Sequence, residues 1–409
     1  MAAVRTTRTR VSVPNLRGIS SPTGYFRTLT ASREVVSGGR LEVFDRRLAV
    51  LRDVEVDFNR CSGKHGGDPL DAVRGQSEEE ELYRFRRGFL TLPGARTPRV
   101  PRLVQPWLDA ILSTVVAGGR RRAAAGTSDE PGWITLMAVR YGYANLFHTV
   151  TDLYNAFLLL TFLGRSPART RVIIADGHPR SPLDGLWTTL FAGSTRISAW
   201  TGRHRFATLA LNPLGYDSPL ELVEQPLLPI VEEFRRFVLG AYGIDVTGER
   251  TGRLRVTLVR RRDYQAHPRN PSGTIRRKIA NERELVRALR ACRVGAPLEV
   301  GSVVLERLPI AEQLRIIAHT DVLVGMHGAG LAHALFLPDR AGLVETYPAY
   351  FSPETRYFRR MAEWRGLFYQ GWQNVDPRRE RPGFRTVVPP EVVIEALRRY
   401  VDAVAPGRP

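Results

Sequence analysis

The chain has 409 residues, 43% of them hydrophobic and 25% charged, which excludes a disordered or fibrous protein and predicts two domains. Its formal charge of +19 is of the kind that nucleic-acid-binding proteins carry. However, only Lys64 and Lys278 are lysines, so 58 of the 60 basic residues are arginines, and these are scattered along the chain. We therefore expect no nucleic-acid partner, and the charge would equally suit a substrate that carries a diphosphate.

The first part of the chain, residues 1–130, lacks a regular alternation of strands and helices, so we expect an irregular region that leads into the first domain. Its acidic run Glu78–Glu81 is typical of a solvated face. Met1–Arg10 is basic with no apolar run behind it, and no apolar run approaches the ~18 residues that span a bilayer. The sequence thus predicts neither a signal peptide nor a membrane span. Cys61 and Cys292 could pair, although nothing requires it, and no Cys/His set has zinc spacing.

From residue 131 onward, apolar strands alternate with helical patterns, and the alternation restarts near residue 252. The expected strands are Trp133–Val139, Arg171–Ala175, Phe206–Leu211, Arg253–Val259, Ser302–Leu305, Val322–Gly325 and Gly342–Thr346. The expected helices are Leu146–Leu163, Leu183–Phe191, Pro226–Tyr242, Asn281–Cys292, Ile310–His319, Gly328–Phe336, Phe358–Trp364 and Glu391–Val404. This order predicts an α/β fold of two doubly wound, Rossmann-like domains, 131–250 and 251–409, that face a cleft. Ligands of such sheets bind beyond the carboxyl ends of the strands.

A glycine-rich turn follows one of these strands in the run Gly325–His333. Gly328 and Gly330 would let the backbone approach an anion closely, and a helix that begins there would present free N–H groups to phosphate. His327 and His333 could add hydrogen-bond donors. The alternative is tight packing of strand on helix, and His333, on the second turn, fits a structural role better than His327.

His148 and Asp152 lie four residues apart at the start of a predicted helix, behind Asn145. That spacing puts both side chains on one helix face, where the carboxylate could orient the imidazole as a general base requires. A capping and packing role is the alternative.

Arginines follow the first strand of the second domain, and several single polar residues follow other strands. Arg260 and Arg261, with His267 and Arg269 further on, could hold phosphate oxygens at two points, although three adjacent arginines at 260–262 also suit a solvated loop. Further candidates at strand ends are Asp176, His178 and Glu345. Of these, Glu345 could accept hydrogen bonds from a ribose. No Asp-x-Asp pair stands at a strand end, so a diphosphate would be stabilised by arginine, histidine and the helix dipole without a metal.

Four runs in this order resemble the plant-type β-1,2-xylosyltransferases of glycosyltransferase family 61, which also includes extracellular O-GlcNAc transferases. They are Tyr143–Asp152, Asn212–Tyr216, Val259–Arg269 and Gly325–His333. With Glu78–Phe85 and Asp176–His178, the resemblance extends over roughly residues 75–375. It implies a GT-B fold, an inverting mechanism without an essential metal or cofactor, UDP-xylose as donor and O2 of the core β-mannose of an N-glycan as acceptor. It also implies a Golgi membrane protein with an anchor, whereas the sequence predicts no anchor segment in this chain.

Two positions depart from the family pattern in the glycine-rich run. Ala332 stands where relatives usually have threonine, and Met326 stands where the plant enzymes have alanine. These changes leave the phosphate argument intact and leave the fine donor specificity open.

Together, these observations give a hypothesis for both sides of the cleft. On the acceptor side (131–250), His148 and Asp152 would remove the acceptor proton, with Asn145, Asp176 and His178 nearby. On the donor side (251–409), the UDP-sugar would be bound by Arg260, Arg261, His267, Arg269, His327, Gly328, Gly330, His333 and Glu345. The alternatives are another family 61 transferase, with UDP-GlcNAc or UDP-arabinose as donor and a protein or xylan acceptor, and a non-catalytic glycan-binding module. Dinucleotide redox chemistry is disfavoured because neither domain has the G-x-G-x-x-G fingerprint with its acidic partner.

Overall fold

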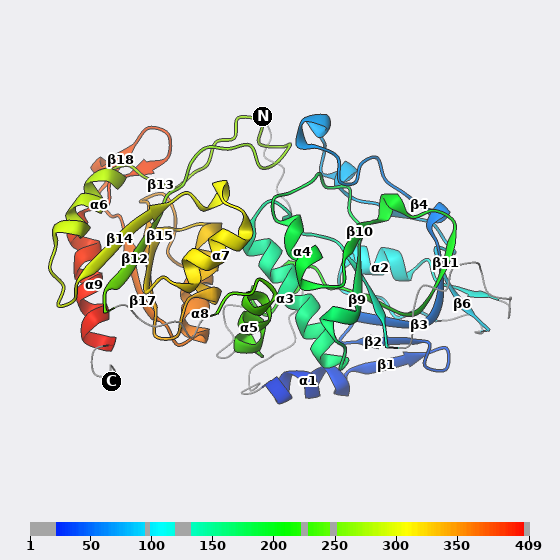
Figure 1. Cartoon of the computed structure of the whole chain (residues 1–409). Coiled ribbons are helices and arrows are strands. Elements are labelled where there is room, and N and C mark those ends of the chain that lie inside the picture. The colour runs from blue at the N-terminus through cyan, green and yellow to red at the C-terminus, as the bar shows by residue number, and fades with distance from the viewer. Residues whose placement is uncertain (1–21, 95–98, 119–131, 222–227, 246–251, 405–409) are drawn as a thin grey trace.

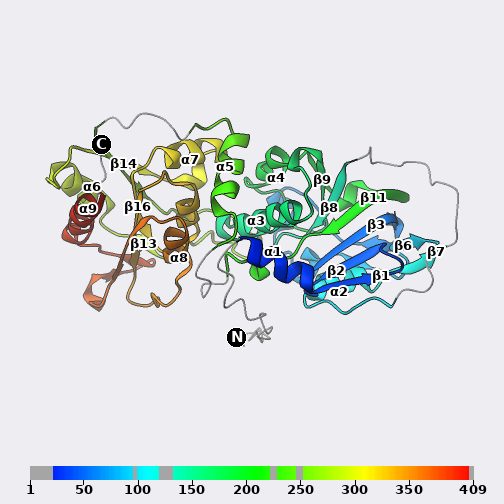
Figure 2. The same cartoon turned by 90° about the horizontal axis from the view of Figure 1, so that it is seen from below.

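The computed structural model describes residues 22–94, 99–118, 132–221, 228–245 and 252–404. Within these ranges it is a mixed α/β protein with two main sheets, one in each half of an elongated molecule (Figures 1 and 2). Several helices lie between the two sheets, so that the halves share a helical layer. The start of the helix that was predicted over Pro226–Tyr242 lies outside the described residues.

The α-helices are α1 (Pro22–Ala31), α2 (Pro106–Leu112), α3 (Leu146–Phe162), α4 (Asp184–Leu190), α5 (Val231–Ala241), α6 (Glu282–Ala291), α7 (Ile310–Ala318), α8 (Tyr357–Trp364) and α9 (Pro390–Val404). The 3-10 helices are η1 (Phe58–Arg60), η2 (Leu70–Val73), η3 (Glu79–Glu81), η4 (Pro167–Arg169), η5 (Ile197–Ala199), η6 (Gly215–Asp217), η7 (Leu305–Arg307), η8 (Ala329–Phe336) and η9 (Pro377–Arg379). Five short strands of the described residues lie outside the main sheets and form two small ones. These are β4 (Cys61–Ser62) with β5 (Arg84–Phe85), and β13 (Lys278–Ile279) with β19 (Arg385–Thr386) and β18 (Glu380–Arg381).

The first main sheet is mixed rather than purely parallel. Its strands are β1 (Arg33–Val36), β2 (Leu41–Phe44), β3 (Leu48–Asp57), β6 (Leu90–Pro93), β7 (Val116–Gly118), β8 (Ile134–Ala138), β9 (Thr170–Ile174), β10 (Ser194–Arg196) and β11 (Arg203–Leu211). The predicted strands β8, β9 and β11 pair in parallel, whereas β3 joins β11 in antiparallel register and carries β2 and β1 on its other edge. The expectation of a doubly wound first domain is therefore wrong for this edge of the sheet.

The expectation of an irregular region over residues 1–130 is also wrong for its described part. Residues 33–57 form a three-stranded antiparallel meander, and β6 extends the same sheet. Val54 and Val56 alternate with charged residues, but their strand is completed by β11, which lies about 146 residues further along the chain. Pairing over such a distance leaves little local signal in a sequence.

The second main sheet is all-parallel, as expected. Its order is β14 (Leu298–Val303), β12 (Leu254–Val259), β15 (Val322–Met326), β16 (Gly342–Tyr347) and β17 (Phe368–Gln373). Helices cover both faces, because residues of α6 and α9 pack on one face and residues of α7, α8 and η8 on the other. The chain runs from β12 outward to β14 and then returns to β15 on the other side, so strand order reverses between β12 and β15. Ligands of open parallel sheets bind at such a switch point.

One apolar cluster joins the two halves. It contains Val150 and Leu153 of α3 together with Leu331 and Leu335 of η8, and the two helices lie against each other. The predicted helix after Gly328 is in fact the 3-10 helix η8. This packing fixes the carboxyl ends of the second sheet beside the N-terminal end of α3.

Candidate active site

A cavity of about 200 Å³ lies at the switch point of the second sheet and has walls from both halves of the chain. The second half contributes Val259 at the end of β12, Arg261, and Gly330 and His333 of η8. The first half contributes Ala144 and Leu146 at the start of α3, and the loop Arg180–Leu183. The structure thus brings together three of the predicted donor-side residues: Arg261, Gly330 and His333.

Arg261 lines this cavity without a carboxylate partner among the described residues. Its Nε donates to the carbonyl oxygen of Arg276, 3.2 Å away, and its guanidinium packs over Gly328, where any Cβ atom would overlap it. Burial, helped by the nearby charge of Arg277, lowers the pKa of Arg261 to about 10. A cation that is enclosed and unpaired is stabilised by an anionic ligand.

Arg277 is a second cation near Arg261, although it is not one of the residues that line the cavity, and it was not among the predicted site residues. Its Nε is buried without a hydrogen-bond partner in the described structure, and burial lowers its pKa. The guanidinium lies over the ring of Phe351, 4.5 Å from its centre. The residue has a φ of 61°, a left-handed conformation that is rare for residues other than glycine and that clusters at functional sites.

The other predicted arginines are engaged with carboxylates. Arg260 Nε lies 2.8 Å from Glu282 Oε2, and Arg262 binds the same carboxylate. Arg269 binds Glu78 and Glu81, at 3.1 Å each. Arg260 and Arg269 are therefore already paired with acidic residues that lie far along the sequence, whereas Arg261 has no such partner among the described residues.

His327 and Glu345 form a buried pair next to the cavity's glycine-rich wall. His327 Nδ1 lies 2.6 Å from Glu345 Oε1, and the second carboxylate oxygen accepts a hydrogen bond from the hydroxyl of Tyr369 at 2.9 Å. Since both oxygens have partners and Glu345 is fully buried, it does not reach a ribose as predicted. The carboxylate instead fixes the His327 ring with its proton on Nδ1, a common way of orienting a functional histidine.

His148 lies on the first turn of α3, where Asn145 caps the helix by accepting a hydrogen bond from the backbone N–H of Phe147. Its ring packs against the backbone of Gly142 and against Tyr141, with ring centres 4.6 Å apart. The carboxylate nearest to Nδ1 is Glu221, with its Oε1 at 3.5 Å. About a quarter of the His148 side chain is exposed, so a substrate can reach it.

The predicted pairing of Asp152 with His148 is wrong. Asp152 is fully buried, and its Oδ2 accepts a hydrogen bond from the backbone N–H of Tyr141 at 3.0 Å. Gly215 lies so close that a Cβ atom there would be 2.8 Å from Asp152 Oδ1. Burial raises the pKa of Asp152 well above its usual range. Asp152 is thus a structural group that ties α3 to the loop after β8 and to the motif Asn212–Tyr216.

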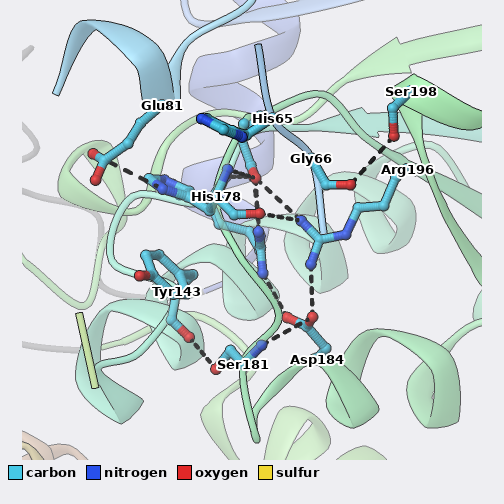
Figure 3. A network of polar contacts seen from close by, with 12 residues as sticks. His65, Gly66, Glu81, Tyr143, His178, Ser181, Asp184, Arg196 and Ser198 are labelled. Carbon is cyan, nitrogen blue, oxygen red and sulfur yellow. Dashed lines mark hydrogen bonds and ion pairs between the residues drawn. The ribbon is translucent and has the colours of Figure 1, made fainter. Parts of the chain in front are cut away.

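His178 belongs to a buried polar network rather than to an open acceptor site (Figure 3). Asp176, also buried, is part of the same network, because its Oδ1 accepts a hydrogen bond from the backbone N–H of His178 at 3.1 Å. Asp176 is bound by Arg140 at 2.7 Å and by Arg196 at 3.3 Å, and these charges hold its pKa far below its usual range. Asp184 bridges the same two arginines. His178 Nε2 donates to the carbonyl oxygen of Arg140 at 2.9 Å, and burial lowers the pKa of His178 to about 4. The network braces the loops after β8 and β9.

Glu81 connects this network to the second half of the chain. It is buried, so the expectation of a solvated acidic run is wrong for this residue. Its carboxylate lies 3.9 Å from His178 Nδ1, 3.3 Å from His267 Nε2 and 3.1 Å from Arg269. Burial raises the pKa of Glu81 to about 7. The His267 ring also lies against Tyr143, with ring centres 5.4 Å apart. The 267–269 segment therefore contacts the first half and does not line the cavity.

The described residues contain neither a cluster of metal-ligating side chains nor a helix that could span a membrane. No group of three or more His, Cys, Asp or Glu side chains is placed to hold a metal ion in this part of the chain. Within the same residues, no helix combines the length and apolarity that crossing a bilayer requires. Cys61 and Cys292 are both free thiols.

Comparison with known proteins shows that the sequence of this chain is similar to those of glycosyltransferases. The family model for glycosyltransferase 61 matches residues 147–344, a range that runs from α3 to β16. The chain is 30% identical over 387 residues to a beta-1,2-xylosyltransferase of Oryza sativa subsp. japonica, across 85% of this chain and 69% of that protein. It is 28% identical over 427 residues to a beta-1,2-xylosyltransferase of Arabidopsis thaliana, across 86% and 77% of the two chains. A shorter match, 37% over 140 residues, is to the EGF domain-specific O-linked N-acetylglucosamine transferase of Rattus norvegicus, across 34% and 24%.

Proposed function

Because the chain belongs to glycosyltransferase family 61, we propose that it is an inverting transferase that moves xylose from UDP-xylose to O2 of the core β-mannose of an N-glycan. The observation that carries the proposal is the cavity at the switch point, lined by the unpaired guanidinium of Arg261. The similarity to two xylosyltransferases along about 85% of this chain supports xylose as the sugar. The two sheets with a site between them fit the GT-B type, with an acceptor side at 131–250 and a donor side at 251–409. Residence in the Golgi lumen stays a prediction.

On the donor side, Arg261 and Arg277 bind the diphosphate. Both are cations without a carboxylate partner among the described residues, and the absence of a Cβ atom at Gly328 lets the Arg261 guanidinium lie directly over the backbone there. When the bond between the anomeric carbon and the phosphate oxygen breaks, the electron pair stays on UDP. Fixed positive charge stabilises that leaving group without a metal.

On the acceptor side, His148 is the general base. The acceptor hydroxyl oxygen attacks the anomeric carbon from the face opposite UDP, and its proton passes to His148 Nε2. Glu221, 3.5 Å from Nδ1, stabilises the imidazolium that forms. His148 lies on the first turn of α3, and Leu146, the first residue of the same helix, lines the cavity. In the proposed reaction the acceptor therefore enters at the N-terminal end of α3.

A second candidate donor is UDP-GlcNAc. It is favoured by the similarity of a third of the chain to a protein whose name describes it as an N-acetylglucosamine transferase. A panel of UDP-xylose, UDP-GlcNAc, UDP-arabinose and UDP-glucose, read by UDP release with a truncated N-glycan as acceptor, separates the two. Turnover of UDP-xylose alone is expected, whereas turnover of UDP-GlcNAc alone would replace the main proposal by the second. No release of UDP from any donor would contradict both.

The base assignment has its own test. His148→Ala is expected to bind UDP as the wild type does and to lose about 10²–10⁴ in transfer rate. His319→Ala is the matched control, because His319 is an exposed histidine at the C-terminal end of α7. Full transfer by His148→Ala would exclude the base role.

A further inference from the structure

His333 carries a buried ring nitrogen without a partner at the wall of the cavity. The side chain is 1% exposed, and its Nδ1 lies 2.9 Å from the carbonyl oxygen of Gly330, one turn earlier in η8. Its other nitrogen, Nε2, is enclosed and has no hydrogen-bond partner among the described residues. A buried polar atom without a hydrogen-bond partner is unfavourable, so its presence indicates a ligand that supplies the missing hydrogen bond.

The chemistry of that ligand follows from the first hydrogen bond. A carbonyl oxygen can only accept, so Nδ1 must carry the proton in its bond to Gly330. Burial lowers the pKa of His333 to about 4, so the ring is neutral near pH 7 and Nε2 bears a lone pair. Nε2 therefore needs an N–H or O–H donor. A phosphate oxygen, which is itself an acceptor, does not satisfy it.

The surroundings of His333 favour a nucleoside as the source of that donor. The cavity wall near it is largely apolar and includes Val259, Leu305 and Ala329, which suits the faces of a base. Arg261, the diphosphate-binding cation of the proposed function, lines the same cavity. A ligand whose phosphates are held at Arg261 would place its nucleoside within this space.

We propose that His333 determines nucleotide specificity by accepting, at Nε2, a hydrogen bond from the nucleoside of the donor substrate. The bond comes from the uracil N3–H or from a ribose hydroxyl, both of which offer the same chemistry. This inference rests on the proposed function, since it takes a uridine nucleotide to be the ligand. His333 is then a binding residue and takes no part in proton transfer to the acceptor.

Titration calorimetry of the full chain with four nucleotides tests the inference. UDP carries both possible donors; CDP has an acceptor at N3 in place of the N–H; 2′-deoxy-UDP and 3′-deoxy-UDP each lack one hydroxyl. We expect the wild type to bind one or more of the three analogues about 10-fold more weakly than UDP, because a buried acceptor is then left unpaired. If only CDP is weakened, the base is the source; if only a deoxy analogue is weakened, the ribose is the source.

A variant shows whether His333 causes the discrimination. In His333→Phe, UDP should bind about 10-fold more weakly, and its advantage over the disfavoured analogue should disappear. His333→Gln keeps a side-chain acceptor and should recover part of the discrimination. His319→Phe, which replaces an exposed histidine with a comparable bond from Nδ1 to a backbone carbonyl, should change neither affinity nor discrimination.

The outcomes separate the inference from the function on which it rests. Wild-type protein that binds no UDP would overturn the proposed function and the inference together. UDP binding with equal affinity for all three analogues, or a preference that His333→Phe leaves unchanged, would overturn the inference alone. The analogue series uses wild-type protein, so it decides the matter even if a variant fails to fold.

Discussion

Replacing Arg261 by methionine should stabilise the free protein and weaken UDP binding. Arg261 is enclosed without a carboxylate, and its pKa falls from 12.5 to about 10. That fall corresponds to a cost of roughly 3 kcal/mol in the free energy of folding for as long as Arg261 keeps its charge. The penalty applies fully at every pH below about 10, and it fades only as the pH rises toward 12.5, where the unfolded chain also loses the proton. Methionine fills similar space without charge, but it loses the hydrogen bond to the Arg276 carbonyl, about 1 kcal/mol. The expected gain is therefore about 2 kcal/mol at pH 7.

Thermal unfolding with and without UDP measures both effects. Without UDP, Arg261→Met should melt a few degrees above the wild type. UDP at about 100 times its Kd should raise the stability of the wild type by about 2.7 kcal/mol and should raise that of the variant far less, because a charged hydrogen bond to phosphate is lost. Arg260→Met is the matched control. The Arg260 guanidinium is next to Arg261 in sequence but is paired with Glu282, so UDP should stabilise this variant as it does the wild type. A lower melting temperature for Arg261→Met without ligand, or an undiminished response to UDP, would refute the reasoning.

Two further predictions concern groups that position the site. The pKa of Glu81 is raised to about 7 in the folded chain, whereas in the unfolded chain the carboxyl ionises near its ordinary pKa of about 4.5. As the pH rises from about 4.5 to 7, the wild type should therefore lose on the order of 2 kcal/mol of stability relative to Glu81→Gln. Denaturant titrations at pH 4.5 and 7.5 measure this, and an equal difference at the two values would contradict it. Gly215→Ala should destabilise by about 1–3 kcal/mol, because its Cβ atom would overlap Thr151 and crowd Asp152. Gly185→Ala in α4 is its control, since nothing lies within 4 Å of the added atom, and equal melting temperatures of the two variants would exclude the crowding argument.

The second sheet and its switch point could be predicted because their signals are local. Val322–Gly325 is a short apolar run that ends in glycine, and the sequences of β12, β15 and β16 are each typical of a strand without reference to the rest of the chain. The glycine-rich turn was predicted to face a ligand for the same reason, since its position after a strand is visible in the sequence. The N-terminal meander was not predicted, because β3 depends on a partner that follows much later in the chain.

The roles of single charged residues could not be predicted, because they depend on partners brought close by the fold. Arg260 and Arg261 are adjacent in sequence, yet one meets Glu282 and the other meets only backbone and the cavity. Asp152 has the spacing to face His148, but the backbone N–H of Tyr141 lies where it can take the carboxylate instead. Spacing along a helix restricts which side chains share a face, and the loop that packs on that face decides which contact forms.

The apolar cluster that runs from α3 to η8 bears on how this enzyme can be divided or recombined. Cutting the chain near residue 250 would expose the apolar surface that each half now buries against the other. We therefore expect neither piece to stay soluble alone. A chimera that takes residues 251–409 from a relative would need matching side chains on both α3 and η8. Because the cluster couples the two halves, we expect the intact chain to unfold in a single thermal transition, in which the cavity walls from both halves are lost together.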